Sequence, residues 1–344
     1  MPKAVRMVDI AKRVGVSTVT VSKALADKEG VSDEIRERIK ETAQQMGYQM
    51  VPASRKSRQS GTGNIGIVVP ARFINYSTNS FYWEMYEKAV NRLMTSDYYG
   101  ILELLAEDSE RNLILPRVLQ DNKIDGLIVI GQLSRAYRAM LQKKMLVPTV
   151  FLDSYDAYGG GYSVISDGYY GMYAVTNYVL SMGHRNIHFL GDINATSSIC
   201  DRYFGYCRAM MEHNIPVTPD MILSDRDQSG QIGFALPEKL PTAYVCNCDV
   251  SAFELINRLE DRGLHVPQDV SVAGFDNYSV PYISMPNITT YAVDMSGMAR
   301  ACVDGLLHQI RHKHFSTGIK IISGRIVVRG SVKKLDSAEP QDPA

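Results

Sequence analysis

The sequence predicts an α/β protein in which three short N-terminal helices precede a larger domain of alternating strands and helices. Three observations support this prediction. Apolar residues recur at helical spacing three times before residue 48, and after residue 64 short apolar runs alternate with amphipathic segments. A basic stretch containing Ser and Gly separates these two regions. Because 344 residues exceed what one ordinary core needs, we expect several domains.

The net charge is zero over the whole chain but is unevenly distributed. Residues 1–58 carry twelve Lys and Arg against seven Asp and Glu, whereas the remainder carries 25 against 30. A basic end on a mildly acidic body suggests a module that binds a polyanion.

The five cysteines follow no disulfide or zinc-ligand spacing, so we expect free thiols in a reducing compartment, with no metal and no cofactor. The first residues lack the apolar core of a signal peptide. No segment reaches the roughly 18 apolar residues that a membrane span needs. A soluble, cytoplasmic protein is therefore expected.

The first helix is predicted over Val8–Val14 and ends at Gly15, which suits a tight turn between helices. Ser17 is a suitable N-cap for the second helix, Thr18–Leu25, and Ser32 for a third. This order is the helix-turn-helix pattern, in which the second helix enters the major groove of DNA. The residues alone also allow a generic three-helix bundle with a polar face.

Residues 7–48 resemble the DNA-binding headpiece of the LacI/GalR repressor family. The matching motifs are D-I-A-x-x-x-G-V-S at Asp9–Ser17, T-V-S at Thr20–Ser22, V-S at Val31–Ser32, R-x-R-I at Arg36–Ile39 and G-Y at Gly47–Tyr48. The resemblance implies that the partner is double-stranded operator DNA. It implies base contacts from Thr18, Val19 and Lys23, with Met7 beside them, and phosphate contacts from Arg6, Ser17, Ser22 and Ser32.

The linker departs from the family pattern. Members usually carry a hinge helix with a leucine that wedges into a minor-groove base step, and Ser57 stands at that position here. Arg55 and Lys56 remain able to follow phosphates. A flexible basic linker is favoured over a folded hinge helix.

The rest of the chain predicts a doubly wound, mostly parallel fold with two sheets. The predicted strands are Ile65–Val69, Ile101–Leu105, Gly126–Ile130, Thr149–Leu152, Val164–Ser166, Ile187–Leu190, Ala243–Cys246, Ser271–Phe275 and Ile288–Val293. The predicted helices include Phe81–Met94, Tyr169–Met182, Asp201–His213 and Val250–Arg262. Ligands of such folds bind beyond the carboxyl ends of the strands.

Acidic residues follow four of these strands, namely Asp153, Asp192, Asp249 and Asp276, and Arg202 opens a helix. Carboxylates accept hydrogen bonds from hydroxyl groups and a guanidinium donates them, so this set suits a hydroxyl-rich ligand. Aspartate after a strand also caps the next helix, and we expect that role above all for Asp192 and Asp249.

The body also resembles the effector-binding core of the same family, which is similar to periplasmic sugar-binding proteins with two lobes, three crossing segments and a ligand in the cleft. The motifs are V-P-T-V-F-L-D ending at Asp153, S-D-G at Ser166–Gly168, G-H-R-x-I at Gly183–Ile187, D-R-x-x-G at Asp201–Gly205, V-A-G-F-D at Val272–Asp276, I-T-T at Ile288–Thr290 and I-V-V-R at Ile326–Arg329. The resemblance covers about residues 5–332. It implies that Asp153, Arg202 and Asp276 bind ligand hydroxyls and that Phe81 and Tyr82 line the pocket.

The resemblance also implies domain boundaries. These are a headpiece at 1–48, a hinge or linker at 49–63, a two-lobe effector-binding and dimerisation domain at 64–332 (an N-lobe of about 64–165 and 294–322 and a C-lobe of about 166–290 and 325–332), and a disordered tail at 333–344. The tail lacks leucine heptads, so a homodimer is expected.

Two positions depart from the sugar-binding pattern. Gln228 stands where many members have a stacking aromatic, and Cys248 stands where an Asn often contacts the ligand. Tyr155, Tyr158 and Tyr162 could form a compensating lid, although an ordinary surface loop is the favoured interpretation.

The expected function is a transcriptional repressor of carbohydrate-utilisation genes, controlled by a small sugar-like effector. Control by a purine or by a partner protein is the alternative. A transport-type binding protein and an enzyme on the same fold are disfavoured, because a headpiece is present and no catalytic motif is found.

Overall fold

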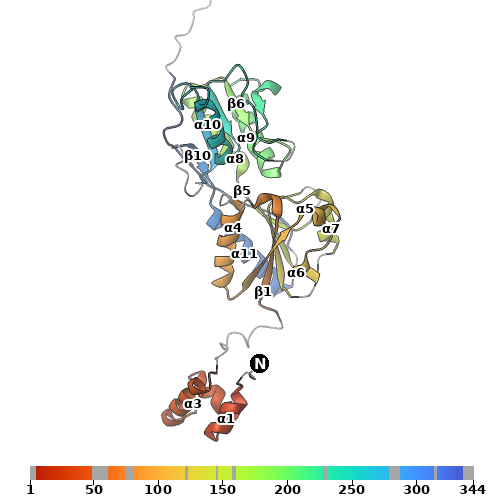
Figure 1. Ribbon diagram of the computed structural model, residues 1–344, viewed down its shortest axis with the longest axis vertical. Coiled ribbons are helices and arrows are strands. Elements are labelled where there is room, and N and C mark those ends of the chain that lie inside the picture. The colour runs from red at the N-terminus through yellow and green to blue at the C-terminus, as the bar shows by residue number, and fades with distance from the viewer. Residues whose placement is uncertain are drawn as a thin grey trace, which may run out of the picture. The chain divides into compact units, whose positions relative to one another are not determined.

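The computed structural model describes residues 5–48, 61–74, 81–120, 123–144, 146–156, 160–227, 231–278, 287–313 and 316–335. The chain divides into two compact units, Met1–Gly61 and Thr62–Ala344 (Figure 1). Each unit is described by itself.

The first unit is a bundle of three helices, α1 (Met7–Val14), α2 (Thr18–Leu25) and α3 (Asp33–Gln45). Gly15 ends α1 at a φ of 79°, which glycine adopts without the penalty that a Cβ would bring. The Ser17 hydroxyl accepts a hydrogen bond from the Thr20 amide at 3.1 Å, so it caps α2 as predicted. The inward faces of the helices form one apolar core of Ile10, Ala11, Val21, Ala24, Leu25, Ile39 and Ala43.

The second unit contains two six-stranded sheets, which confirms the predicted fold class. The first sheet has the order β11-β5-β4-β3-β1-β2, with β1 Asn64–Pro70, β2 Tyr99–Leu105, β3 Gly126–Ile130, β4 Thr149–Leu152, β5 Tyr162–Ser166 and β11 Gly318–Ile322. The second has the order β12-β10-β9-β8-β6-β7, with β6 Ile187–Leu190, β7 Ile222–Leu223, β8 Ala243–Cys246, β9 Ser271–Asp276, β10 Thr289–Ala292 and β12 Arg325–Val327. Among the named strands that the structure describes, β12 alone pairs antiparallel, with β10. We call the parts built on the first and second sheets the N-lobe and the C-lobe.

Helices cover both faces of each sheet, so the inner strands, such as β1, β3, β4, β8 and β9, are buried along almost their whole length (Figure 1). In the N-lobe, α4 (Phe81–Met94) and α11 (Met295–His312) pack on one face. The other face carries α6 (Arg117–Gln120) and α7 (Arg135–Lys143), and the short α5 is Glu107–Arg111. In the C-lobe, α8 (Gly168–Ser181) and α9 (Ser197–Glu212) pack opposite α10 (Asp249–Glu260). Two 3-10 turns are Ala71–Phe73 and Pro219–Met221.

The chain passes between the two lobes three times, after β5, after β10 and after β11. These crossing segments are tied to one another. The Asp167 amide donates to the Ile322 carbonyl at 3.1 Å, and the Gly324 amide donates to the Tyr291 hydroxyl at 2.8 Å. The crossings place the carboxyl ends of both sheets within reach of each other, as the contacts of the site below demonstrate.

Gly205 explains one motif of the sequence. A Cβ at this position would lie 2.1 Å from the carbonyl oxygen of Tyr169, so only glycine lets α9 pack this closely on α8. None of the described helices is long and apolar enough to cross a membrane.

Candidate DNA-binding face and effector site

The described residues that were predicted to touch DNA lie at the surface of the first unit. Six of them are exposed and two, Met7 and Ser22, are half-buried; the exposed ones are Arg6, Ser17, Thr18, Val19, Lys23 and Ser32. Val19 is 64% exposed, although it is a large apolar residue, because the buried face of α2 is formed by other side chains. An exposed β-branched side chain in the first turn of such a helix suits contact with a thymine methyl group.

A surface network connects the turn after α2 to helix α3. Asp27 accepts hydrogen bonds from Lys40 at 2.8 Å and from Arg36 at 3.4 Å. The hydrogen bond from Lys40 lowers the pKa of Asp27, and the charges of Lys40 and Arg36 add to this effect, although burial opposes it. Arg36 also donates to the Lys28 carbonyl at 2.9 Å. The first arginine of the R-x-R-I motif therefore fastens a turn. Arg55, Lys56 and Ser57 lie outside the described residues.

In the second unit, the structure brings three of the predicted effector residues together from both lobes. Asp153 follows β4 in the N-lobe, and its Oδ2 accepts a hydrogen bond from the Tyr82 hydroxyl of α4 at 3.1 Å. In the C-lobe, Arg202 of α9 donates through Nη2 to Oδ1 of Asp276, the last residue of β9, at 3.0 Å. Asp153, Arg202 and Asp276 are all buried. We call these three residues together with Tyr82 the effector cluster.

Arg202 is held on three sides. Its Nη1 donates to the Asn247 carbonyl at 2.5 Å, its Nη2 binds Asp276, and its guanidinium lies 4.0 Å from the ring centroid of Phe275. Burial alone would lower the pKa of Arg202, but the carboxylates of Asp276 and Asp153 outweigh that effect and raise it. The side chain is therefore a fixed cation.

Backbone strain marks both aspartates of the cluster. Asp153 has a φ of 61° and Asp276 a φ of 99°, which residues with a Cβ rarely adopt. Strained backbone of this kind concentrates at ligand-binding positions. The backbone is therefore strained at one carboxyl-bearing residue of each lobe, Asp153 in the N-lobe and Asp276 in the C-lobe.

Burial dominates the electrostatics of the carboxylates. It raises the pKa of Asp153 to about 7, although Arg202 opposes the shift, and Asp276 and Asp201 add to it. Burial likewise raises the pKa of Asp276 against the effect of Arg202. It also raises the pKa of Asp249 well above the usual range, and Asp276 contributes.

Two polar atoms of the cluster have no hydrogen-bond partner among the described residues. They are Oδ1 of Asp153 and Nε of Arg202, both buried. Buried polar groups are nearly always paired, so an unpaired acceptor and an unpaired donor in one cluster indicate a place for a polar ligand.

Aromatic side chains stand beside Tyr82. Its ring centroid lies 4.7 Å from that of Phe73 and 5.4 Å, edge to face, from that of Phe81. Phe81 and Tyr82 were predicted to line the pocket, whereas Phe73 was not. An aromatic surface of this kind accepts the apolar face of a sugar ring.

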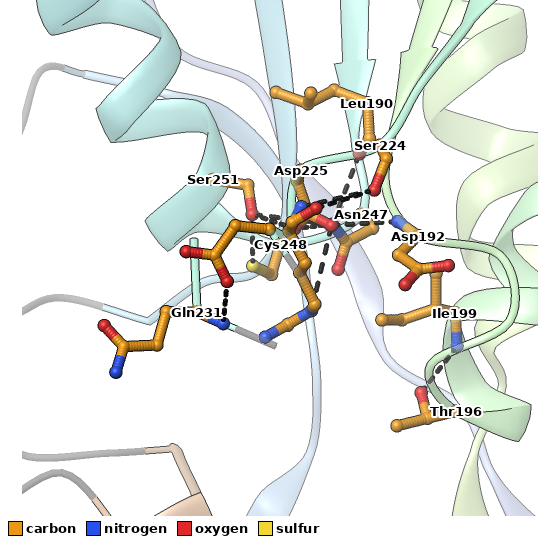
Figure 2. A network of polar contacts seen from close by, with 12 residues as sticks. Leu190, Asp192, Thr196, Ile199, Ser224, Asp225, Gln231, Asn247, Cys248 and Ser251 are labelled. Atoms are coloured by element: carbon orange, nitrogen blue, oxygen red, sulfur yellow. Dashed lines mark hydrogen bonds and ion pairs between the residues drawn. The ribbon is translucent and has the colours of Figure 1, made fainter. Parts of the chain in front are cut away.

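A polar network around Asp225, which Figure 2 shows, was not predicted from the sequence. Asp225 is fully buried and accepts hydrogen bonds from the Asn247 side-chain amide at 2.6 Å, the Ser251 hydroxyl at 2.5 Å and the Asp192 amide at 2.8 Å. Because the Asn247 carbonyl also holds Arg202, this network fixes the loop on which the cluster depends. A lone Asp in a loop carries no periodic signal that would have identified it.

Two predicted helix caps are wrong. Thr196 caps α9, and Asp192 instead accepts from the Asn194 amide within a local turn. Cys248 occupies the N-cap position of α10, and Asp249, the first helical residue, accepts from the Tyr278 amide at 2.9 Å. An aspartate after a strand bonds whichever amide the loop presents, and here that amide is not in the helix.

Five other predicted residues have different outcomes. The Cys248 thiol lies 3.2 Å from the Ser251 hydroxyl, next to the Asp225 network, and Gln228 lies outside the described residues. Tyr162 belongs to β5 and packs on the N-lobe core, so it is no part of a lid. Tyr155 donates to Oδ1 of Asp201 at 2.6 Å and so connects the lobes, whereas Tyr158 is not described.

Comparisons with known proteins agree with the helical first unit and with the two-lobe second unit. A family profile described as bacterial regulatory proteins, lacI family, matches residues 6–50, and one described as a periplasmic binding protein-like domain matches residues 176–332. The HTH-type transcriptional repressor PurR of Vibrio campbellii is 28% identical over 334 residues, which cover 95% of this chain and 98% of the relative. The solved lac repressor dimer bound to operator and the anti-inducer ONPF has a TM-score of 0.73 at 20% identity, covering 96% of this chain and 100% of that one. A complex of the transcriptional regulator CelR with cellobiose has a TM-score of 0.66 at 18% identity, covering 95% and 99%.

Proposed function

This chain belongs to the LacI/GalR family of DNA-binding transcriptional regulators, and on that premise we propose that it is a repressor whose affinity for operator DNA is set by a sugar-like effector. The effector cluster carries the proposal, because it combines a fixed cation, two buried carboxylates and an aromatic surface. Hydroxyl groups satisfy such a set, since each one both donates and accepts. Similar proteins add support: CelR has been solved in complex with cellobiose, and the lac repressor dimer has been solved bound to operator.

On the DNA side, we propose that Thr18, Val19 and Lys23 contact base edges, with Met7 beside them. Arg6, Ser17, Ser22 and Ser32 hold phosphates, and Arg55 and Lys56 add to that hold. Lys23 presents a point charge where a planar guanidinium would grip guanine through two hydrogen bonds, so discrimination at that base should be modest. The protein would act in the cytoplasm as a homodimer, because two headpieces match a near-palindromic operator.

On the effector side, we propose that Asp153 and Tyr82 of the N-lobe and Arg202 and Asp276 of the C-lobe bind one ligand together. A ligand that contacts both lobes favours the arrangement in which they are close. Its differential affinity for that arrangement is the source of any change in operator binding.

The test measures operator affinity of the full-length chain with and without candidate sugars. An operator is first selected from random duplexes, and its affinity is then measured at rising salt. We expect affinity to fall steeply with salt, because phosphate contacts dominate it. The T18A/K23A double variant should lose preference for the selected operator. Preference retained by that variant would contradict the assignment of the DNA-binding face.

A second variant tests the proposed effector site. Asp276→Asn keeps an acceptor for Arg202 but removes a carboxylate, so a sugar that changes operator affinity of the natural chain should change it far less in the variant. An undiminished response would contradict the proposed effector site while leaving the DNA-binding assignment intact.

A further inference from the structure

Carboxylates outnumber cations around the effector cluster. Asp153 faces Arg202, Asp276, Tyr82 and Asp201, so one guanidinium stands among three carboxyl groups. Asp249 adds a fourth carboxyl beside Asp276, with Arg329 as its nearby cation. Most of these side chains are buried, so the carboxyl groups raise one another's pKa, and a further negative charge placed among them would be little screened by water.

The guanidinium groups nearby are already committed to acceptors within the protein. Both Nη groups of Arg202 are used, by Asn247 and Asp276, and only its Nε remains. Arg329 donates to the Ile288 carbonyl at 2.7 Å and to the Asn277 side chain at 2.6 Å. Nε of Arg226 lies 3.7 Å from the Asp225 carboxylate. Within the part of the chain that the structure describes, neither Arg202 nor Arg329 therefore offers a phosphate or carboxylate ligand a free pair of Nη donors of the kind that binds it.

Two of the helix N-termini at this edge carry an acidic residue. The carboxylate of Asp167 caps α8 by accepting from the Tyr170 amide at 3.2 Å, so it already satisfies the dipole of that helix and repels a second anion. Asp249 is the first residue of α10, although its carboxyl accepts from the Tyr278 amide. The N-terminus of α9 has no acidic residue in its first turn and is capped by the Thr196 hydroxyl, which accepts from the Ile199 amide at 3.2 Å.

The two unpaired atoms have the chemistry of a hydroxyl site. Oδ1 of Asp153 needs a donor, and Nε of Arg202 needs an acceptor. A hydroxyl group serves both, whereas an ionised phosphate oxygen only accepts and can pair with Oδ1 of Asp153 only after that carboxyl group takes up a proton. The raised pKa of Asp153, about 7, has the same origin in burial and neighbouring carboxylates, and a further anion would raise that pKa more.

We infer that the effector site takes an uncharged, hydroxyl-rich ligand and excludes phosphorylated or carboxylated forms of the same ligand. This inference rests on the proposed function, because it names the class of effector for the same site. It separates this chain from a regulator that senses a sugar phosphate or a sugar acid.

The test compares matched pairs by calorimetry on the full-length protein: ribose with ribose 5-phosphate, glucose with glucose 6-phosphate, and galactose with galacturonate. For any pair that binds, we expect the neutral sugar to bind at least about tenfold more tightly, because the anion gains a buried like charge without a paired cation. An anionic member that binds as tightly as its neutral partner, or more tightly, overturns the inference.

If no sugar in the panel binds, that result contradicts the proposed sugar-like effector but leaves the exclusion of anions to be tested. A second experiment then decides the inference. The probe is inorganic phosphate, and its binding is measured as a rise in the midpoint temperature of thermal unfolding of the second unit. The natural chain should show no stabilisation that depends on Arg202, whereas Asp276→Asn, which removes one carboxylate beside Arg202, should gain it. Asp220→Asn, at an exposed position of the same lobe, is the matched control and should gain nothing. Phosphate binding by the natural chain that Arg202→Gln abolishes, or no gain in Asp276→Asn, overturns the inference.

Discussion

Replacing Arg202 by lysine tests whether the geometry of the guanidinium, and not only its charge, organises the effector cluster. Arg202 makes two charge-assisted hydrogen bonds, at 2.5 and 3.0 Å, to acceptors on two different strand ends, and its plane lies 4.0 Å from the Phe275 ring centroid. A lysine ammonium keeps the charge but is a single point that cannot reproduce the planar fork.

The expected cost follows from these contacts. Losing one hydrogen bond to a charged group costs about 1.5–3 kcal/mol, and losing the ring contact adds about 0.5–1 kcal/mol. We therefore expect Arg202→Lys to lower the free energy of unfolding of the second unit by about 2–4 kcal/mol. It should also weaken binding of any effector, because Nε, the one unpaired donor, is removed.

Urea unfolding of the full-length protein measures this cost, and Arg208→Lys is the matched control. Arg208 lies on the same helix and pairs with Glu212 at 2.9 Å, but both side chains are exposed. The exposed pair should lose less than about 1 kcal/mol. Equal losses in the two variants would refute the claim that buried bonds hold Arg202 in place.

Three further predictions concern pH, packing and DNA. Burial raises the pKa of Asp153 to about 7, so the folded state stabilises its protonated form. The free energy of unfolding of the natural chain, relative to that of Asp153→Asn, should therefore fall as the pH rises from about 4 to 7 and stay level above that range. The fall should be at most about 1.4 kcal/mol per pH unit. Urea titrations across that range that give a constant difference would contradict the burial argument. Gly205→Ala should destabilise the second unit by roughly 1–3 kcal/mol or more in thermal unfolding, because its Cβ meets the Tyr169 carbonyl, whereas Gly330→Ala, with open space around it, should change little. Lys23→Arg should sharpen discrimination for guanine at one operator position by roughly 1–3 kcal/mol without changing the salt slope, and gel-shift titrations on base-substituted operators would expose a failure of that expectation.

Much of the fold could be predicted because each major element leaves a periodic trace. Continuous apolar runs identified nine strands, and α4 was predicted with the bounds that the structure has. Three strands were missed because they leave weaker traces: β7 has two residues, β12 has three, and four of the five residues of β11 are exposed. Helix α11 was not named, although its buried residues recur at helical spacing, as in Met298, Cys302 and Leu306.

The site was only partly predictable for a different reason. Asp153, Arg202 and Asp276 were found because they follow strands or match family motifs, and both signals are local. Asp225 and Asn247 were missed because their importance lies in contacts with each other and with Arg202, which are distant in sequence. The same strand-end pattern that identified Asp153 also suggested caps at Asp192 and Asp249, where the fold presents other amides.

The most direct test is the operator affinity of the full-length chain with and without a bound neutral sugar, measured on the natural protein and on Arg202→Gln. We predict that the sugar changes operator affinity of the natural protein by about 5–150-fold, the usual range of coupling between two sites, and that Arg202→Gln abolishes the change. A change of the same size in Arg202→Gln would contradict the claim that this cluster links the effector to DNA binding.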